Sequence, residues 1–99
     1  MKPAIEVRHN ATASRFEAIV DGLACRADYH LLDGVLRITH VEVAPAHEGR
    51  GIAAQLVRAV FAHAEANGLT VEPWCGYARA YMRRHPDTHR FLPAGFRLE

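Results

Sequence analysis

Three side chains carry functional groups that a group-transfer reaction requires: the thiol of Cys75, the carboxyl group of Glu42 and the imidazole of His40. A helix N-terminus favours the thiolate form of a neighbouring cysteine, and the thiolate is the nucleophilic form. Because Cys75 directly precedes a predicted helix, its thiol is a candidate nucleophile. Glu42 and His40 lie two residues apart on a predicted strand, about 7 Å along its axis. They are therefore expected to share a face, where either suits a general base, with Glu42 the first candidate.

Each of these residues also has a purely structural interpretation. Cys75 follows a tryptophan, and a small half-buried thiol packed under Trp74 fits the sequence as well. Glu42 and His40 are compatible with surface positions at an exposed strand end. The other cysteine, Cys25, lies on an alternating strand face and is expected to belong to the core.

A pair of glycines stands where a predicted strand gives way to a predicted helix. Gly49 and Gly51 permit a tight turn and let a ligand approach the backbone closely. The first N–H groups of the following helix have no internal partners and bind phosphate well, and Arg50 offers a charge-assisted contact. The turn is neither a Gly-x-Gly-x-x-Gly fingerprint nor a Walker loop. An ordinary strand-to-helix turn with an exposed arginine remains the alternative.

The elements that position these residues follow from the hydrophobic pattern. Alternation predicts strands over residues 5–8, 16–20, 23–29 and 35–43. Two Asp-Gly pairs, at residues 21–22 and 33–34, predict tight hairpin turns, so the four strands form an antiparallel meander. Alternation along the last strand divides its side chains between two faces. We expect one face to carry Leu36, Ile38, His40 and Glu42 and the other to carry Val35, Arg37, Thr39, Val41 and Val43.

The second half of the chain changes to helical spacing. Apolar residues recur at helical intervals from Ile52 to Ala64, and Asn67-Gly68 marks the end of that helix. A short strand over residues 69–72 and a second helix over residues 76–85 follow, with an irregular tail after them. A strand, helix and strand in this order predict a right-handed crossover to a parallel neighbour. The fold class is therefore α+β, with four antiparallel strands and a parallel fifth.

Composition excludes several function classes. The 99 residues are expected to form one domain over residues 1–99, as a monomer or weak dimer. A net charge of +1 argues against a nucleic-acid or membrane-surface partner. No apolar leader is evident near the start, and two cysteines are too few for a disulfide scaffold, so a cytoplasmic location is expected. Of the seven histidines, only His85 and His89 have ligand-like spacing, interrupted by Pro86, so no metal site is expected.

The glycine turn resembles the acetyl-coenzyme A loop of the GNAT superfamily of N-acetyltransferases. That loop has the pattern Arg/Gln-x-x-Gly-x-Gly/Ala, and residues 48–53 read Glu-Gly-Arg-Gly-Ile-Ala. Glu48 replaces the usual first residue, which changes a side chain and leaves the backbone cradle intact. The resemblance is closer to one branch of this superfamily, the YjdJ-type N-acetyltransferase-like proteins, whose chains have about 100 residues.

Four ordered motifs carry this closer resemblance over nearly the whole chain. They are His-Val-Glu-Val-Ala-Pro at residues 40–45, Glu-Gly-Arg-Gly-Ile-Ala at residues 48–53, Pro-Trp-Cys at residues 73–75 and Arg-Arg-His-Pro at residues 83–86. A glutamate at the loop position is common in this branch. Val41 and Ala44 depart from its threonine and proline, and neither departure removes a titratable group.

The resemblance implies a minimal GNAT fold and an acetyl-CoA-dependent N-acetyltransferase, with Cys75 as the site of a transient acetyl-thioester. It implies main-chain contacts to pantetheine from Val41 and Val43. It also implies a pyrophosphate site formed by Glu48, Gly49, Arg50, Gly51, Ile52 and Ala53. Tyr81 is a weak candidate for protonating the leaving thiolate and is expected mainly to pack.

The acceptor is an amine of a small molecule or a protein, which the sequence does not specify. The chain is too short for the helices that GNAT enzymes usually place between their first two strands, so the acceptor side is expected to be open. The alternative function is a coenzyme A-binding module with little or no catalysis. A third interpretation, a thiol redox protein, requires Cys25 and Cys75 to lie close together.

Overall fold

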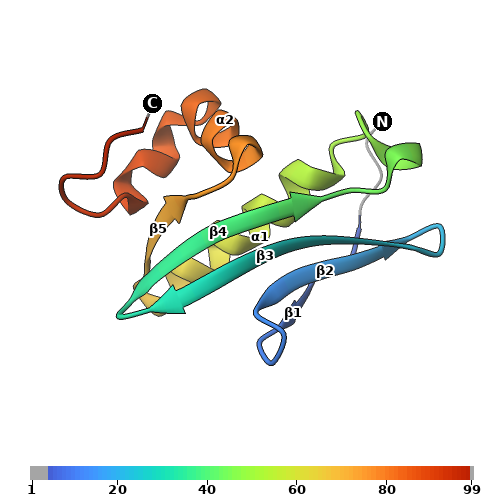
Figure 1. Ribbon diagram of the computed structural model, residues 1–99, viewed down its shortest axis with the longest axis horizontal. Helices are drawn as coiled ribbons and strands as arrows, with labels where there is room; N and C mark the ends of the chain where they lie inside the picture. Colours follow the sequence, from blue (N-terminus) through green and yellow to red (C-terminus); the bar gives the residue numbers. More distant parts are fainter. Residues whose placement is uncertain (1–4, 99) are drawn as a thin grey trace.

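Two hairpin turns fold the first half of the chain into an antiparallel meander of β1 (Arg8–Asn10), β2 (Arg15–Val20), β3 (Leu23–Leu32) and β4 (Val35–Glu42) (Figure 1). Both residues of each Asp-Gly pair have positive φ, at 50° and 80° in the first turn and 53° and 77° in the second. This is the backbone that a tight two-residue hairpin requires, so the predicted turns are confirmed. The structure is a computed structural model, and it describes residues 5–98. The prediction that no apolar leader is present concerns the start of the chain, and residues 1–4 of that segment lie outside the described residues.

The second half adds a parallel strand through a helical crossover. A short 3₁₀ turn (Pro45–His47) leads into α1 (Ile52–Asn67), which ends at Gly68 in the left-handed conformation, and β5 (Thr70–Pro73) pairs parallel to β4. Then come α2 (Gly76–Arg84) and a 3₁₀ helix (Pro86–Phe91), where we had expected an irregular tail. The sheet order β1-β2-β3-β4-β5 confirms the predicted α+β topology.

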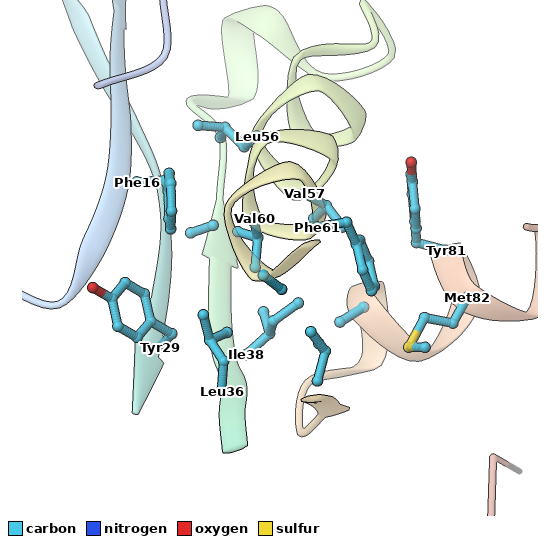
Figure 2. Packing of buried hydrophobic residues seen from close by; sticks show 14 of the residues in the cluster. Phe16, Tyr29, Leu36, Ile38, Leu56, Val57, Val60, Phe61, Tyr81 and Met82 are labelled. Atoms are coloured by element: carbon cyan, nitrogen blue, oxygen red, sulfur yellow. The ribbon is translucent and has the colours of Figure 1, made fainter. Parts of the chain in front are cut away.

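The core lies between one face of the sheet and the two helices. Figure 2 shows side chains of β2, β3 and β4 facing α1, with α2 beside it. Phe61 joins the layers, because its ring lies 6.0 Å from the ring of Tyr81 and 5.1 Å from that of Phe91. The buried side chains of the strands alternate with exposed or half-buried ones. One face of the sheet is thus covered by helices, and no described helix covers the other, which we call the open face.

The first strand begins later than the apolar pattern predicts. Alternation over residues 5–8 favoured a strand there, whereas β1 covers Arg8–Asn10. The backbone N–H of Ile5 donates to the Oε1 atom of Gln55 in α1, at 3.3 Å, and not to a strand partner. Ile5 and Val7 still pack against the core. The apolar pattern therefore identified the residues that pack against the core, but it did not predict the hydrogen-bond partner of the Ile5 backbone.

A one-residue bulge interrupts the pairing of β3 with β4. Tyr29 pairs with Ile38 and Asp28 pairs with His40, so Thr39 is an extra residue on β4 with no counterpart on β3. An extra residue in one strand reverses the side-chain alternation beyond it, because the period of a strand is two. The second part of β4 therefore presents the opposite set of side chains to the helices.

This bulge makes the predicted face assignment of the strand wrong. Leu36 and Ile38 are fully buried, as expected, but His40 and Glu42 lie on the open face with about half of each side chain exposed. Val41, expected on the solvent side, is half-buried and packs against the core. Strict alternation from Leu36 to Glu42 fails because it assumes a regular strand.

A small aromatic cluster attaches β1 to the rest of the molecule. The ring of His9 stacks on Phe16 with centroids 4.3 Å apart, and its Nε2 atom shares a 2.6 Å hydrogen bond with the Tyr29 hydroxyl. The ring of His63 in α1 meets it edge-on at 4.4 Å. Burial, with a smaller contribution from the charge of His63, lowers the pKa of His9 below its usual 6.5. The folded chain therefore favours neutral His9.

We expect this cluster to make stability depend on pH. Because the pKa of His9 is lower in the folded chain, the unfolded chain binds its proton first as the pH falls below 6.5. The free energy of unfolding should then decrease from pH 6.5 down to the lowered pKa. Urea unfolding above and below pH 6.5 measures this decrease, which should be smaller in His9→Gln. An equal decrease in both chains would show that His9 is not responsible.

Candidate active site

A cavity of about 510 Å³ lies where the end of β4 meets the start of α1 and the first turn of α2. Its volume is within the range of small-molecule sites. The residues that line it come from β4, the glycine turn, α1 and α2, and they are Val41, Val43, His47, Glu48, Gly49, Gly51, Ile52, Ala53, Ala54 and Tyr77. Seven of the eight residues predicted to bind a coenzyme are therefore in one place, around one cavity.

The glycine turn leaves the start of α1 free to bind an anion. Gly49 and Gly51 have φ values of 81° and 80°, in the left-handed region that favours glycine. No side chain caps the helix at Gly51, and its first turn contains no acidic residue. The backbone N–H groups of Ile52 and Ala53 thus lie at the cavity wall without a capping partner. Unpaired N–H groups and the positive end of the helix dipole suit a phosphate.

The parallel strands separate just before this cavity. Pairing of β4 with β5 ends at Ile38 opposite Pro73, followed by a 2.9 Å hydrogen bond from the Trp74 N–H to the Ile38 carbonyl. Residues 39–42 of β4 have no partner on β5. Because the bulge leaves Val41 on the same face as Ile38, the backbone N–H and C=O of Val41 point to the edge where β5 is missing. That edge is open to pairing with an extended ligand.

A buried histidine that we did not predict connects the glycine turn to the hairpin between β2 and β3. His47 is only 4% exposed, and its Nε2 atom hydrogen bonds to the Val20 carbonyl at 3.0 Å. Its Nδ1 atom accepts from the Arg50 guanidinium at 2.9 Å, which makes Nε2 the protonated nitrogen. Asp21 lies 3.7 Å from the same guanidinium. Arg50 is therefore held against the hairpin turn. It is the one residue predicted to bind the coenzyme that does not line the cavity.

A tyrosine on α2 completes the cavity wall. Tyr77 is half-buried, and burial is the main cause that raises the pKa of its hydroxyl above 10.0. The phenol thus keeps its proton at neutral pH. Tyr81 is instead buried at 5% exposure, with its ring stacked 4.0 Å from His85. The expectation that Tyr81 packs agrees with this position, and Tyr77 is the tyrosine that sequence reasoning missed.

Cys75 caps the helix that carries this tyrosine. Its Sγ atom accepts a hydrogen bond from the backbone N–H of Ala78 at 3.4 Å, and the residue is half-buried. It lies two residues before Tyr77 and outside the cavity lining. Cys25 is fully buried in β3, as expected, and both thiols are free.

The two candidate bases form a pair on the open face. The Nε2 atom of His40 lies 3.1 Å from Oε1 of Glu42, and the Arg26 guanidinium lies 3.5 Å from the same oxygen. The hydrogen bond from His40 lowers the pKa of Glu42 most, and the charge of Arg26 adds to it. The carboxylate is thus ionised at neutral pH and can bind a cation. Neither residue lines the cavity.

The signals for the unpredicted residues differ in kind. Tyr77 follows the predicted Cys75 by two residues in the first turn of a predicted helix, so its position beside the site could have been found. His47 could not, because its burial depends on the Asp21 turn, 26 residues earlier in the chain.

Comparisons with known proteins agree with this geometry. The family model of the GCN5-related N-acetyltransferases matches residues 15–91, which is more than half of the chain. The chain belongs to this family. The match includes β2 to α2, and thus all the residues of the cavity. The expected membership of the GNAT superfamily is thereby confirmed.

A solved structure shares the fold of this GNAT chain. It is the NMR solution structure of a GCN5-like protein from Staphylococcus aureus, with a TM-score of 0.72 and 21% sequence identity. The match covers 89% of this chain and 87% of the other. A search of curated proteins finds no match. Within residues 5–98, no helix is long and apolar enough to cross a membrane, and no three His, Cys, Asp or Glu side chains form a group that could hold a metal ion.

Proposed function

We propose that this GNAT protein is an acetyl-CoA-dependent N-acetyltransferase. The observation that carries the proposal is the cavity at the uncapped start of α1, placed beside the separated edge of β4. The first feature suits a pyrophosphate and the second suits the amide groups of pantetheine. A single ligand that has both groups in this order is coenzyme A.

The described residues fit the coenzyme in detail. Space for phosphates is open beside the glycine turn, because a Cβ atom built on Gly49 meets no atom within 4 Å. The N–H groups of Ile52 and Ala53 would bind the pyrophosphate, and the backbone of Val41 would pair with pantetheine. Glu48 lines the same cavity, but its carboxylate repels phosphate, so the backbone carries the anion contacts.

We propose that Cys75 receives the acetyl group before the amine does. Its thiolate attacks the thioester carbonyl, so that a new C–S bond forms and the bond to the coenzyme sulfur breaks. The leaving thiolate takes a proton from the hydroxyl of Tyr77, which lines the cavity. The Ala78 N–H, 3.4 Å from Sγ, stabilises negative charge on the Cys75 sulfur before attack and again after the acetyl group leaves.

The second step transfers the acetyl group to the amine. The amine nitrogen attacks the acetyl carbon, a C–N bond forms, and the Cys75 thiolate is released. The surplus proton of the amine passes to the pair of His40 and Glu42 and from there to solvent. Tyr77 recovers its proton from solvent. The alternative, a coenzyme-binding module, shares the first half of this proposal and lacks both chemical steps.

One experiment separates the enzyme from the module. Coenzyme A binding is measured by calorimetry, and transfer of labelled acetyl groups is then followed with a panel of amines and peptides. Binding together with transfer supports the enzyme. Binding without transfer, to the protein or to any amine, would establish the module. Absence of binding would contradict both proposals.

A further inference from the structure

Arg50 stands between the two glycines of the glycine turn, yet it does not line the cavity that the turn borders. Gly49 and Gly51 both adopt the left-handed conformation. Among the described residues, the backbone N–H groups of residues 49–51 donate to no protein acceptor. Glycine loses more conformational freedom on folding than any other residue. A turn of this composition therefore needs a contact beyond its own backbone to keep one conformation.

The side chain of Arg50 supplies that contact. Its guanidinium donates to the Nδ1 atom of His47 at 2.9 Å and lies 3.7 Å from a carboxylate oxygen of Asp21. The buried imidazole is itself fixed, because its Nε2 atom donates to the Val20 carbonyl at 3.0 Å. One partner of the guanidinium is a hydrogen-bond acceptor and the other balances its charge. The guanidinium is therefore engaged in contacts within the protein.

These contacts lead to the turn between β2 and β3, which is distant from the glycine turn in sequence. Figure 1 shows this hairpin turn and the end of β4 at the same end of the sheet. Val20 is the last residue of β2, and Asp21 and Gly22 form a two-residue turn with positive φ at both positions. A turn of this kind matches the twist of the strands it joins. The paired strands thus give the glycine turn a fixed point of attachment.

We propose that Arg50 and His47 are positioning residues, which hold the glycine turn in the conformation that binds pyrophosphate. This inference rests on the proposed coenzyme site. Arg50 then makes no phosphate contact of its own, in contrast to the role that its sequence position suggested. The phosphates are bound by backbone N–H groups, whose directions depend on the φ values of Gly49 and Gly51. A turn that already has the bound conformation loses less conformational entropy when the ligand binds, so its affinity is higher.

The mobility of the turn tests this inference without any ligand. Arg50→Met removes the contact at a side chain that is 44% exposed, so the core stays intact. We expect the variant to lower the heteronuclear NOE of the Gly49 and Gly51 amides, which reports backbone motion on the picosecond to nanosecond timescale. Arg90→Met is the matched control, because it removes the same charge from an ion pair with Glu65 near the other end of α1. Equal NOE values in Arg50→Met and wild type would overturn the inference.

Coenzyme affinity separates positioning from direct contact. Calorimetry with coenzyme A should show a loss of about tenfold in Arg50→Met and no loss in Arg90→Met. His47→Gln keeps an N–H group for the Val20 carbonyl and removes the acceptor of Arg50. It should also weaken binding, and the double variant should bind no more weakly than Arg50→Met, because both changes break one contact. Unchanged or higher affinity in His47→Gln would mean that the released guanidinium binds phosphate, which contradicts the inference.

The salt dependence of affinity gives an independent measurement. Salt screens the attraction between a guanidinium and a phosphate. We expect the affinity of Arg50→Met for coenzyme A to fall with salt as steeply as that of Arg90→Met, since neither arginine contacts phosphate. A flatter dependence in Arg50→Met alone would show that Arg50 is a phosphate ligand. Coenzyme binding by wild type with unchanged affinity in Arg50→Met would overturn this inference alone, whereas absence of binding by wild type would overturn the proposed function as well.

Discussion

Cys75→Ser is expected to abolish the acetyl adduct on the protein and to lower acetyl transfer on the order of 100-fold or more. A serine hydroxyl is not ionised at neutral pH, so it cannot replace the thiolate as nucleophile. The structural role of the residue survives this change, because serine is a strongly preferred N-cap and its hydroxyl can accept the Ala78 N–H. The variant therefore separates chemistry from folding. Cys75→Ala would remove both, at a cost of about 1 kcal/mol for the lost cap.

Intact mass after incubation with acetyl-CoA measures the adduct, and a rapid assay of labelled product measures transfer. Cys25→Ala is the companion variant, since it removes the other thiol, which is fully buried in β3, and leaves Cys75 in place. It should keep the adduct. If Cys75→Ser loses the adduct but transfers at the wild-type rate, the amine attacks the thioester directly. If both cysteine variants still form an adduct, Cys75 is not the acceptor.

Local sequence signals predicted most of the fold, because they act within a few residues. Both Asp-Gly pairs adopt the positive φ values that their turns require, and Gly68 ends α1 where the Asn-Gly signal placed it. The glycine turn was predicted for the same reason, since Gly49 and Gly51 specify a backbone that few other residues adopt. Most of the residues around the cavity follow from that turn and from the strand before it, whereas Tyr77 comes from α2.

The errors arose where the structure depends on distant partners. Nothing in the pattern from Leu36 to Glu42 marks Thr39 as a bulge, because the extra residue is defined only by the register with β3. The same holds for His47, whose burial and hydrogen bond depend on Val20, the last residue of β2. Alternation counts residues along one chain segment, whereas bulges and buried polar contacts are properties of pairs of segments.

Gly49→Ala is expected to weaken coenzyme A binding about tenfold, while Gly34→Ala leaves binding unchanged. The two glycines have nearly identical backbones, with φ of 81° and 77°, and a Cβ atom at either one meets nothing within 4 Å. An alanine at either position therefore carries the same left-handed strain, about 1–2 kcal/mol. Only Gly49 lines the cavity, so only there does the new methyl group take space that a phosphate would occupy.

The pair of variants removes the usual ambiguity of a glycine substitution, because loss of stability is common to both and loss of space is confined to one. Urea unfolding should give equal decreases in the free energy of unfolding, and calorimetry with coenzyme A should give different affinities. Equal losses of affinity in both variants would mean that coenzyme binding follows global stability and that the glycine turn is not its site. A loss in Gly49→Ala alone would also be smaller for pantetheine than for coenzyme A, because pantetheine has no pyrophosphate to meet the turn.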